Sequence, residues 1–114
     1  MTERIAVILP AFNEEAALPG VLAEVAAVGA AQIIVVDNGS SDETAEVARR
    51  GGAEVVSEPR RGYGQACLAG MAALRRDITV VVFMDADGSD DPAEMARLIG
   101  PIERGEAGMV LGSR

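Results

Sequence analysis

Short runs of apolar residues alternate along the chain with longer stretches that place apolar side chains at helical spacing. In the first long stretch, Leu18, Val21, Leu22, Val25 and Val28 recur every three or four residues, which is typical of a helix that buries one face. The short runs are continuously apolar, as parallel strands are when helices cover both faces of their sheet. We therefore expect strands and helices to alternate, at residues 5–9, 14–28, 33–36, 40–50, 53–56, 62–74 and 79–84, followed by a helix from Asp91 and a strand at 109–111.

This alternation predicts one α/β domain over residues 1–114, Rossmann-like, with a mainly parallel sheet between two layers of helices. A chain of 114 residues suits one compact domain, and its 49% apolar content excludes an intrinsically disordered chain. Ser40 and Glu43 have the spacing of a capping box at the start of the second helix.

The apolar runs are too short for a signal peptide or a membrane span. We therefore expect a soluble, cytoplasmic protein without a transmembrane segment, and leave peripheral contact with a membrane open. A sheet edge that no strand covers would drive self-association, so a homo-oligomer is a further expectation.

The composition excludes several kinds of chemistry. All ten basic residues are arginine, histidine is absent, and Cys67 is the single cysteine, which excludes a Ser-His-Asp triad, a Cys-His dyad and a phosphate loop built on lysine. Eighteen acidic residues give a net charge of −8, which argues against nucleic acid as a partner. If the ligand is a polyanion, a divalent cation held by carboxylates is the obvious group to neutralise it.

Polar clusters follow three of the predicted strands directly, at residues 10–15, 37–42 and 85–92. In an open parallel sheet, ligands bind outside the carboxyl ends of the strands. The three clusters are therefore expected to meet at one edge of the sheet, and this convergence predicts a ligand site.

Asp85 and Asp87 place two carboxylates just beyond the most apolar strand. Residues two apart in extended backbone point to the same face, and paired carboxylates suit Mg²⁺ or Mn²⁺, which also take oxygens from substrate phosphates. The alternative is that both aspartates are turn residues and that Asp90 or Asp91 caps a helix. Because two further clusters converge on the same edge, we favour the metal site.

The other clusters leave alternatives open. Asp37 is placed to accept hydrogen bonds from a base or ribose, although the segment after it also suits a turn and a helix cap. Glu14 and Glu15 either contact a ligand or complement a helix dipole in a first turn. Residues 60–65, with two arginines and two glycines at a helix start, are either an anion-binding loop or a solvated turn.

Five ordered motifs cover essentially the whole chain and resemble family 2 glycosyltransferases of the GT-A fold, especially bacterial relatives of dolichyl-phosphate mannose synthase. The motifs are V-I-L-P-A-F-N-E-E, I-I-V-V-D-N-G-S-S-D-E-T, R-R-G-Y-G-Q-A, V-F-M-D-A-D-G-S-D-D-P and V-L-G-S-R. The resemblance implies a GT-A three-layer α/β/α fold, apparently truncated, because domains of the family continue well past this length. It implies metal-dependent, inverting transfer of a sugar from a nucleotide-diphosphate sugar to a lipid phosphate or a small molecule.

The resemblance also implies the residues of the donor site. Asp85 and Asp87 would bind Mg²⁺ or Mn²⁺ at the diphosphate, and Asn38 stands where many members have a second aspartate. Ser89 stands where the polyprenyl-phosphate subgroup often has glutamine. With the arginine- and glycine-rich loop included, the expected nucleotide-sugar-binding set is Pro10, Ala11, Phe12, Glu14, Asp37, Asn38, Arg61, Gly64, Asp85 and Ala86.

The missing half of the family domain would supply the acceptor site and the aspartate that acts as general base, so we expect that base beyond Arg114 and identify no catalytic residue in this chain. A non-catalytic nucleotide-sugar-binding module is therefore the main alternative. A haloacid-dehalogenase-like phosphatase shares the D-A-D-G-S pattern but needs a lysine, which this chain lacks, and the same holds for a receiver-type signalling domain.

Overall fold

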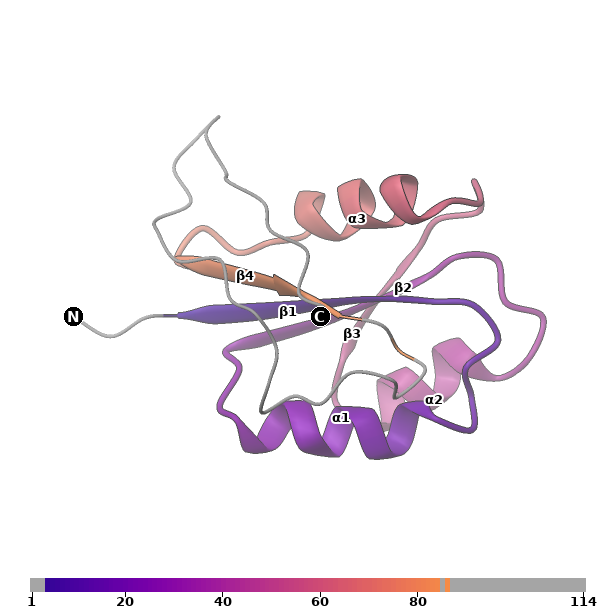
Figure 1. Ribbon diagram of the computed structural model, residues 1–114, viewed down its shortest axis with the longest axis horizontal. Coiled ribbons are helices and arrows are strands. Elements are labelled where there is room, and N and C mark those ends of the chain that lie inside the picture. Colours follow the sequence, from indigo (N-terminus) through magenta and orange to yellow (C-terminus); the bar gives the residue numbers. More distant parts are fainter. Residues whose placement is uncertain (1–3, 85, 87–114) are drawn as a thin grey trace.

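The apolar runs form four parallel strands of one sheet in a computed structural model that describes residues 4–84 and 86 (Figure 1). The β-branched residues that dominate these runs favour extended backbone. The strands lie in the order β3-β2-β1-β4, and every pair is parallel. Their bounds are β1 (Ile5–Ala11), β2 (Gln32–Asp37), β3 (Glu54–Ser57) and β4 (Val80–Phe83).

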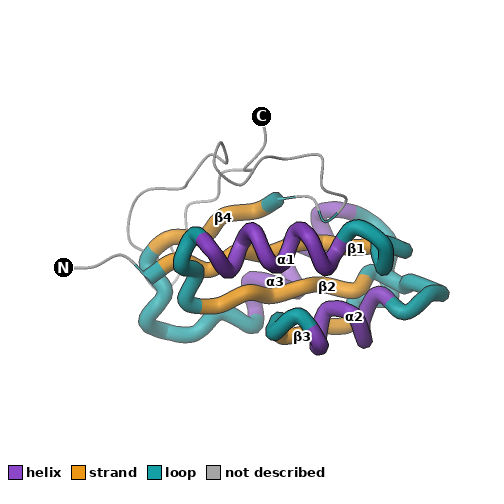
Figure 2. The backbone as a smooth tube through the Cα atoms, turned by 90° about the horizontal axis from the view of Figure 1, so that it is seen from below, coloured by secondary structure: helices purple, strands orange, loops and turns teal. Residues whose placement is uncertain are grey.

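In the described part of the chain, three helices cover both faces of the sheet: α1 (Leu18–Ala27), α2 (Thr44–Arg50) and α3 (Tyr63–Ala72). Figure 2 shows α1 and α2 on the face turned to the viewer, and α3 lies on the opposite face. The predicted three-layer α/β/α arrangement with a mainly parallel sheet is confirmed.

Alternate residues of each strand lie on opposite faces of the sheet and belong to two separate apolar cores. Val7 and Leu9 of β1 pack with Leu22 of α1 on one face, whereas Ile8 packs with Phe83 under α3 on the other. All of these side chains are at most 2% exposed. Because both faces are buried, the strands need the continuous apolar runs seen in the sequence.

The chain reverses direction across the sheet at β1. From β1 it steps outwards through β2 to β3, with α1 and α2 on one face, and α3 then carries it back across the other face to β4. Such a reversal opens a crevice between the carboxyl ends of the two strands that flank it, here β1 and β4. By this rule, a ligand of the domain is expected beside the segments that follow Ala11 and Phe83.

Two sequence predictions about helix starts are wrong. The first helix begins at Leu18 and not at Glu14, because the N–H groups of Glu14 and Glu15 bond to the side chains of Thr44 and Asp42. The expected capping box is absent: α2 begins at Thr44, whose N–H is bonded by Asp42, while the Ser40 hydroxyl accepts a hydrogen bond from Asn13.

The helix expected from Asp91 and the strand expected at 109–111 lie outside the described residues. Within residues 4–84 and 86, no helix has the length and apolar character needed to cross a membrane.

Candidate functional site

The register of the strands brings the polar clusters to one edge of the sheet. Ala11 at the end of β1 pairs with Asp37 at the end of β2, which in turn pairs with Ser57 at the end of β3. On the other side of β1, the Met84 N–H donates to the Ile8 carbonyl over 3.1 Å, so the chain leaves β4 alongside β1. The predicted convergence of the segments after β1, β2 and β4 on the carboxyl edge thus follows from the sheet itself.

The loops after β1 and β2 are joined by reciprocal hydrogen bonds. The Asn13 N–H donates to Ser40 Oγ, and the Ser41 N–H donates back to Asn13 Oδ1, each over 2.8 Å. The Glu14 N–H donates to Thr44 Oγ1 over 2.8 Å. Asn13 adopts a left-handed backbone with φ of 54°, a conformation that asparagine tolerates better than most residues. The two loops therefore form one interlocked unit, which we call the rim staple (residues 13–15 and 40–44).

Glu15 and Asp42 complete the rim staple. Glu15 Oε1 accepts the Glu43 N–H over 2.9 Å, and Asp42 Oδ2 accepts the Glu15 N–H over 3.3 Å. Asp42 also accepts hydrogen bonds from the hydroxyl and the N–H of Thr44. These donors, above all the Thr44 hydroxyl, lower the pKa of Asp42 below its ordinary value of 3.8. The first-turn alternative for Glu15 is therefore wrong for α1, since Glu15 bonds at the entry to α2.

Asp37 is half-buried at the end of β2, and its Oδ1 accepts the Ser40 N–H over 3.0 Å. Among the described residues, none donates a hydrogen bond to its Oδ2. The carboxylate is thus fixed through one oxygen while the other can accept a further hydrogen bond. This geometry fits the predicted contact with a base or ribose, and it contains the predicted turn as well.

Asn38 lies deeper, with 7% of its surface exposed, and contacts the loop after β3. Its Nδ2 donates to the carbonyls of Glu58 and Arg60 over 2.7 and 2.8 Å, and its Oδ1 accepts the Gly62 N–H over 3.2 Å. The Asn38 amide therefore ties the 58–62 loop to the end of β2, together with a backbone hydrogen bond from the Glu58 N–H to the Asp37 carbonyl.

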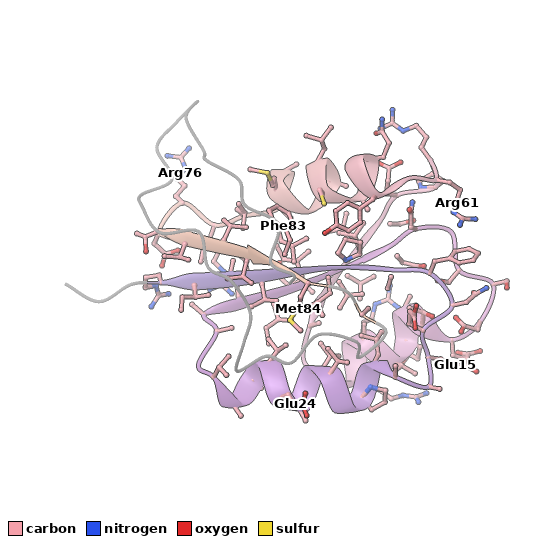
Figure 3. The ribbon with its side chains drawn as sticks, viewed as in Figure 1. Glu15, Glu24, Arg61, Arg76, Phe83 and Met84 are labelled. Carbon is pink, nitrogen blue, oxygen red and sulfur yellow. The ribbon has the colours of Figure 1, made fainter. Side chains whose placement is uncertain are left out.

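Arg61 and Phe12 meet at the outer side of this edge. The Arg61 guanidinium lies 3.7 Å from the centroid of the Phe12 ring, although the two residues belong to the loops after β3 and β1. The stem of Arg61 passes Gly39, where an added Cβ would lie 3.6 Å from Arg61 Cδ. Figure 3 shows Arg61 and Glu15 at the end of the molecule opposite to Arg76. Three loops thus place an exposed aromatic ring and a cation together.

The neighbouring Arg60 is held differently. Its guanidinium and N–H bond to the carboxylate of Glu58, with the shortest contact, from the Arg60 N–H, at 2.9 Å. The hydrogen bonds from Arg60 lower the pKa of Glu58, and the same contacts raise the pKa of Arg60. Of the two adjacent arginines, Arg60 is therefore engaged within its own loop, and Arg61 is the one presented over Phe12.

The start of α3 lies in the same region. Gly62 precedes the helix with φ of 131°, a backbone conformation that glycine adopts readily, and no side chain caps the first turn through a hydrogen bond. A Cβ on Gly64 would meet nothing within 4 Å, so the backbone there is open to close approach. A helix start of this kind favours an anion.

The remaining predicted residues are placed as follows. Pro10 is half-buried and Ala11 buried at the end of β1, Glu14 is half-buried in the rim staple, and Ala86 is 2% exposed in the core under α1. The predicted metal ligands Asp85 and Asp87 lie outside the described residues, on either side of Ala86. Within the described part of the chain, no three acidic, cysteine or histidine side chains gather at metal-binding distance.

Sequence reasoning missed the pairing partners of the rim staple and the clamp that Asn38 makes. The partners of Asn13, Glu14 and Asn38 lie 20 to 30 residues away in the chain, so no local spacing signals them. The only signal was the density of Asn, Ser, Asp and Thr in these loops, which favours side-chain bonds to backbone.

This arrangement defines an α/β domain whose polar loops gather at the carboxyl edge of a parallel sheet, beside the strand at which the chain reverses. The family model for glycosyl transferase family 2 matches residues 6–114. The chain belongs to this family.

Two curated relatives extend the comparison. An uncharacterized glycosyltransferase of Mycobacterium tuberculosis is 46% identical over 112 residues, which cover 98% of this chain and 49% of the relative. The polyprenol monophosphomannose synthase of Mycolicibacterium smegmatis is 38% identical over 125 aligned residues, covering 99% of this chain and 46% of that enzyme. The chain thus spans about half the length of these relatives.

Solved structures share the fold. Glucosyl-3-phosphoglycerate synthase from Mycobacterium tuberculosis, solved in complex with Mn²⁺, UDP-glucose and phosphoglyceric acid, superposes with a TM-score of 0.69 at 34% identity, covering 79% of this chain and 36% of that one. Mannosyl-3-phosphoglycerate synthase from Rubrobacter xylanophilus gives a TM-score of 0.68 at 31% identity, covering 78% and 32%. Both neighbours are glycosyltransferases, so the expected GT-A fold is confirmed.

Proposed function

We propose that this chain is the donor-binding half of a glycosyltransferase and binds a nucleotide-diphosphate sugar together with a divalent cation. The observation that carries the proposal is the register of Ala11 with Asp37 beside the reversal of the sheet, which gathers the polar loops at one crevice. The structural neighbour that holds UDP-glucose and Mn²⁺ supports it, since the similarity covers 79% of this chain.

Different residues of the described region would contact different parts of the donor, according to their chemistry. Asp37, fixed through Oδ1, would accept a hydrogen bond from the base or ribose through Oδ2. Phe12 and Arg61 present a flat ring and a planar cation at the same edge, which suits a base or a phosphate. The open start of α3 around Gly64 would face the diphosphate, because helix starts favour anions.

The cation would be Mg²⁺ or Mn²⁺, held by Asp85 and Asp87. Paired carboxylates are the hard oxygen ligands that both ions take. The residues on either side of Asp85 suit this role, because the Met84 N–H bonds to the Ile8 carbonyl of β1 and Ala86 is buried in the core. A bound cation supplies offsetting charge for the diphosphate leaving group. A chain with a net charge of −8 needs such a charge to hold a polyanion.

This chain is proposed to bind the donor. The acceptor would be either a lipid phosphate or a small molecule. In the complete reaction, the bond between the anomeric carbon and the phosphate oxygen breaks, and a bond from that carbon to an acceptor oxygen forms. The general base that takes the acceptor proton is expected beyond Arg114. Sugar transfer is therefore tested on a protein of the length of the relatives, and donor binding on this chain.

Calorimetric titration tests donor binding directly. We expect UDP or GDP, and the corresponding nucleotide sugars, to bind in the presence of Mn²⁺ and to bind at least about tenfold more weakly in its absence or in Asp87→Ala. The matched control is Glu24→Ala, which removes an exposed carboxylate from the outer side of α1, away from the end where Arg61 and Glu15 lie (Figure 3). Equal binding by Asp87→Ala, or no nucleotide binding by the wild-type chain, would contradict the proposal.

A further inference from the structure

The carboxamide of Asn38 contacts three alternate residues of one loop. Both hydrogens of its Nδ2 are used, by the carbonyls of Glu58 and Arg60, and its Oδ1 accepts the Gly62 N–H. The backbone N–H of Asn38 donates to the Ala11 carbonyl over 2.8 Å, which fixes the residue to the end of β1. The Glu58 N–H also donates to the Asp37 carbonyl over 2.9 Å, so the start of this loop is tied to β2 through its backbone as well, whereas among the described residues Arg60 and Gly62 are held to the end of β2 by the Asn38 side chain.

The chemistry of this contact requires an amide. Two carbonyl oxygens face Nδ2 at 2.7 and 2.8 Å, and a group there must donate two hydrogens while the other atom accepts one. A carboxylate of the same shape would place a negative oxygen against both carbonyls with little water to screen it, since the site is 7% exposed. Asn38 is thus matched to this loop in a way that its closest isostere is not.

The loop that Asn38 holds carries Arg61 and ends where α3 begins. Between the clamped residues 60 and 62, Arg61 has little freedom except in its side chain, which runs past Gly39 to the Phe12 ring. Release of the clamp would free the backbone on both sides of Arg61. The stacked pair and the start of α3 would then lose their fixed place at the edge.

We propose that Asn38 is a positioning residue. Its amide holds the 58–62 loop in the conformation that places Arg61 and the start of α3 at the carboxyl edge of the sheet, where the donor would bind. This inference rests on the proposed function and deepens it: nucleotide affinity depends on Asn38 through the loop and not through a contact of its own with the nucleotide. It replaces the direct nucleotide contact expected for Asn38 from the sequence.

Asn38→Asp tests the inference because protonation partly restores the clamp. The new carboxyl faces two carbonyls, so its pKa is expected above the ordinary value, and its protonated form can donate to one of them. At about pH 8 we expect UDP with Mn²⁺ to bind about tenfold more weakly than to wild type, and at about pH 5 the ratio of the two affinities is expected to move back towards one. Asn38→Ala, which carries no proton, should bind weakly at both values.

Among the described residues, the titratable groups around position 38 are Asp37 on β2 and Glu58, Arg60 and Arg61 on the loop. All four are present in wild type and in both variants. The ratio of affinities at each pH therefore isolates the introduced carboxyl, and the titration of UDP itself cancels in the same ratio.

Gln32 provides a matched control at the opposite end of β2. It is 2% exposed, its Nε2 donates to Glu54 Oε1 and the Ala73 carbonyl, and its Oε1 accepts the Arg75 N–H. Gln32→Glu damages a comparable buried amide, so it is expected to lower the unfolding free energy while leaving the affinity for UDP within about twofold of wild type. If the affinity for UDP fell only because the protein is less stable, both Asn38→Asp and Gln32→Glu would lose affinity.

Two further readouts complete the test, one of the loop itself and one of its effect on the ligand. The amide hydrogen of Gly62 should exchange about tenfold faster in Asn38→Asp at about pH 8 than in wild type, with or without nucleotide. Arg61→Ala should weaken UDP binding in wild type but add little to Asn38→Asp, because both changes remove the same contribution. Additive losses would contradict action through Arg61.

The outcomes separate the two proposals. If wild type binds UDP and Asn38→Asp binds it equally well at about pH 8, the positioning role is overturned and the donor site stands. Faster exchange at Gly62 with unchanged affinity overturns it too. If wild type binds no nucleotide under any condition, the proposed function fails, and the role of Asn38 in affinity fails with it.

Discussion

At the scale of single residues, the carboxyl edge is built as much from residues that hold loops as from residues that can touch a ligand. The sequence motifs around Asn13, Ser40 and Thr44 resemble a binding signature, yet in the structure their side chains bond to backbone groups of the neighbouring loop. Asp37 and Arg61, by contrast, keep an oxygen and a guanidinium directed to the edge. The motif therefore combines a rigid frame with a few exposed groups.

Asp42 makes the rim staple sensitive to acid. Because its folded pKa is lowered, mainly by the Thr44 hydroxyl, Asp42 contributes stability that is fully present above its unfolded value of 3.8 and is lost as the pH falls through the lower folded value. We expect Asn at this position to remove that part of the pH dependence of unfolding. Urea unfolding of wild type and Asp42→Asn across this range measures it.

The control for this experiment is Glu24→Gln, which removes an exposed carboxylate from the outer side of α1. It should retain the acid-dependent loss of stability that Asp42 contributes. Parallel curves of unfolding free energy against pH for wild type and Asp42→Asn would show that the rim staple does not depend on this carboxylate.

The sequence could not predict which side chains of the site bond to one another's loops. Asp37 was expected to accept hydrogen bonds at a strand end, and its position there is confirmed by its pairing with Ala11. Its contact with a ligand stays a prediction, as do the roles of Asp85 and Asp87. The clamp of Asn38 on residues 58, 60 and 62 could not be predicted, because it depends on how the strands place two loops side by side.

At the scale of elements, the strands and helices follow the hydrophobic pattern closely, and their boundaries follow other forces. Each expected strand up to residue 84 is present, because a continuous apolar run has to be covered on both faces. The start of α1 was misplaced by four residues, since Glu14 and Glu15 give their N–H groups to the rim staple and not to a helix. Local propensity carries no information about such a competing partner.

The close packing of α3 on the sheet gives an element-scale prediction. A Cβ placed on Gly70 would lie 2.5 Å from Ile8 Cγ2 and 3.2 Å from Val36 Cγ2, so an alanine there must push α3 away from β1 and β2. We expect Gly70→Ala to lower the unfolding free energy by about 1–3 kcal/mol, as overpacked core substitutions do. Urea denaturation with a two-state fit measures the change.

Gly20→Ala in α1 is the matched control, since its added Cβ would meet nothing within 4 Å. It should raise stability by about 0.5–1 kcal/mol, because alanine loses less backbone entropy than glycine in a helix. A Gly70→Ala variant that is as stable as Gly20→Ala would show that α3 packs less closely than the structure indicates.

At the scale of the whole molecule, the topology explains why the candidate binding residues lie at one end of the sheet. The chain reverses at β1, the helices change faces at the same point, and the segments after β1, β2, β3 and β4 all leave the sheet at the carboxyl edge. The opposite end carries structural contacts such as Gln32 with Glu54 and Arg4 with Asp77. Self-association through a sheet edge stays a prediction.

The fold class could be predicted from the whole-chain pattern because alternation and burial are sequence-wide signals. The donor site could be predicted only as a set of segments, since register and loop pairing decide which atoms face the crevice. The acceptor and the general base were assigned by resemblance to a region beyond this chain. They therefore depend on the part of the family domain that this chain does not span.

The most direct test of the account is paramagnetic broadening of amide signals by Mn²⁺ in the presence of UDP. If the donor site lies at the carboxyl edge, signals there, such as those of Ala11, Asp37 and Ala86, should lose intensity only when both Mn²⁺ and UDP are present. Signals at the opposite end, such as those of Gln32 and Thr79, should keep theirs. Broadening at the opposite end, or none at the carboxyl edge, would contradict the assignment of the donor site.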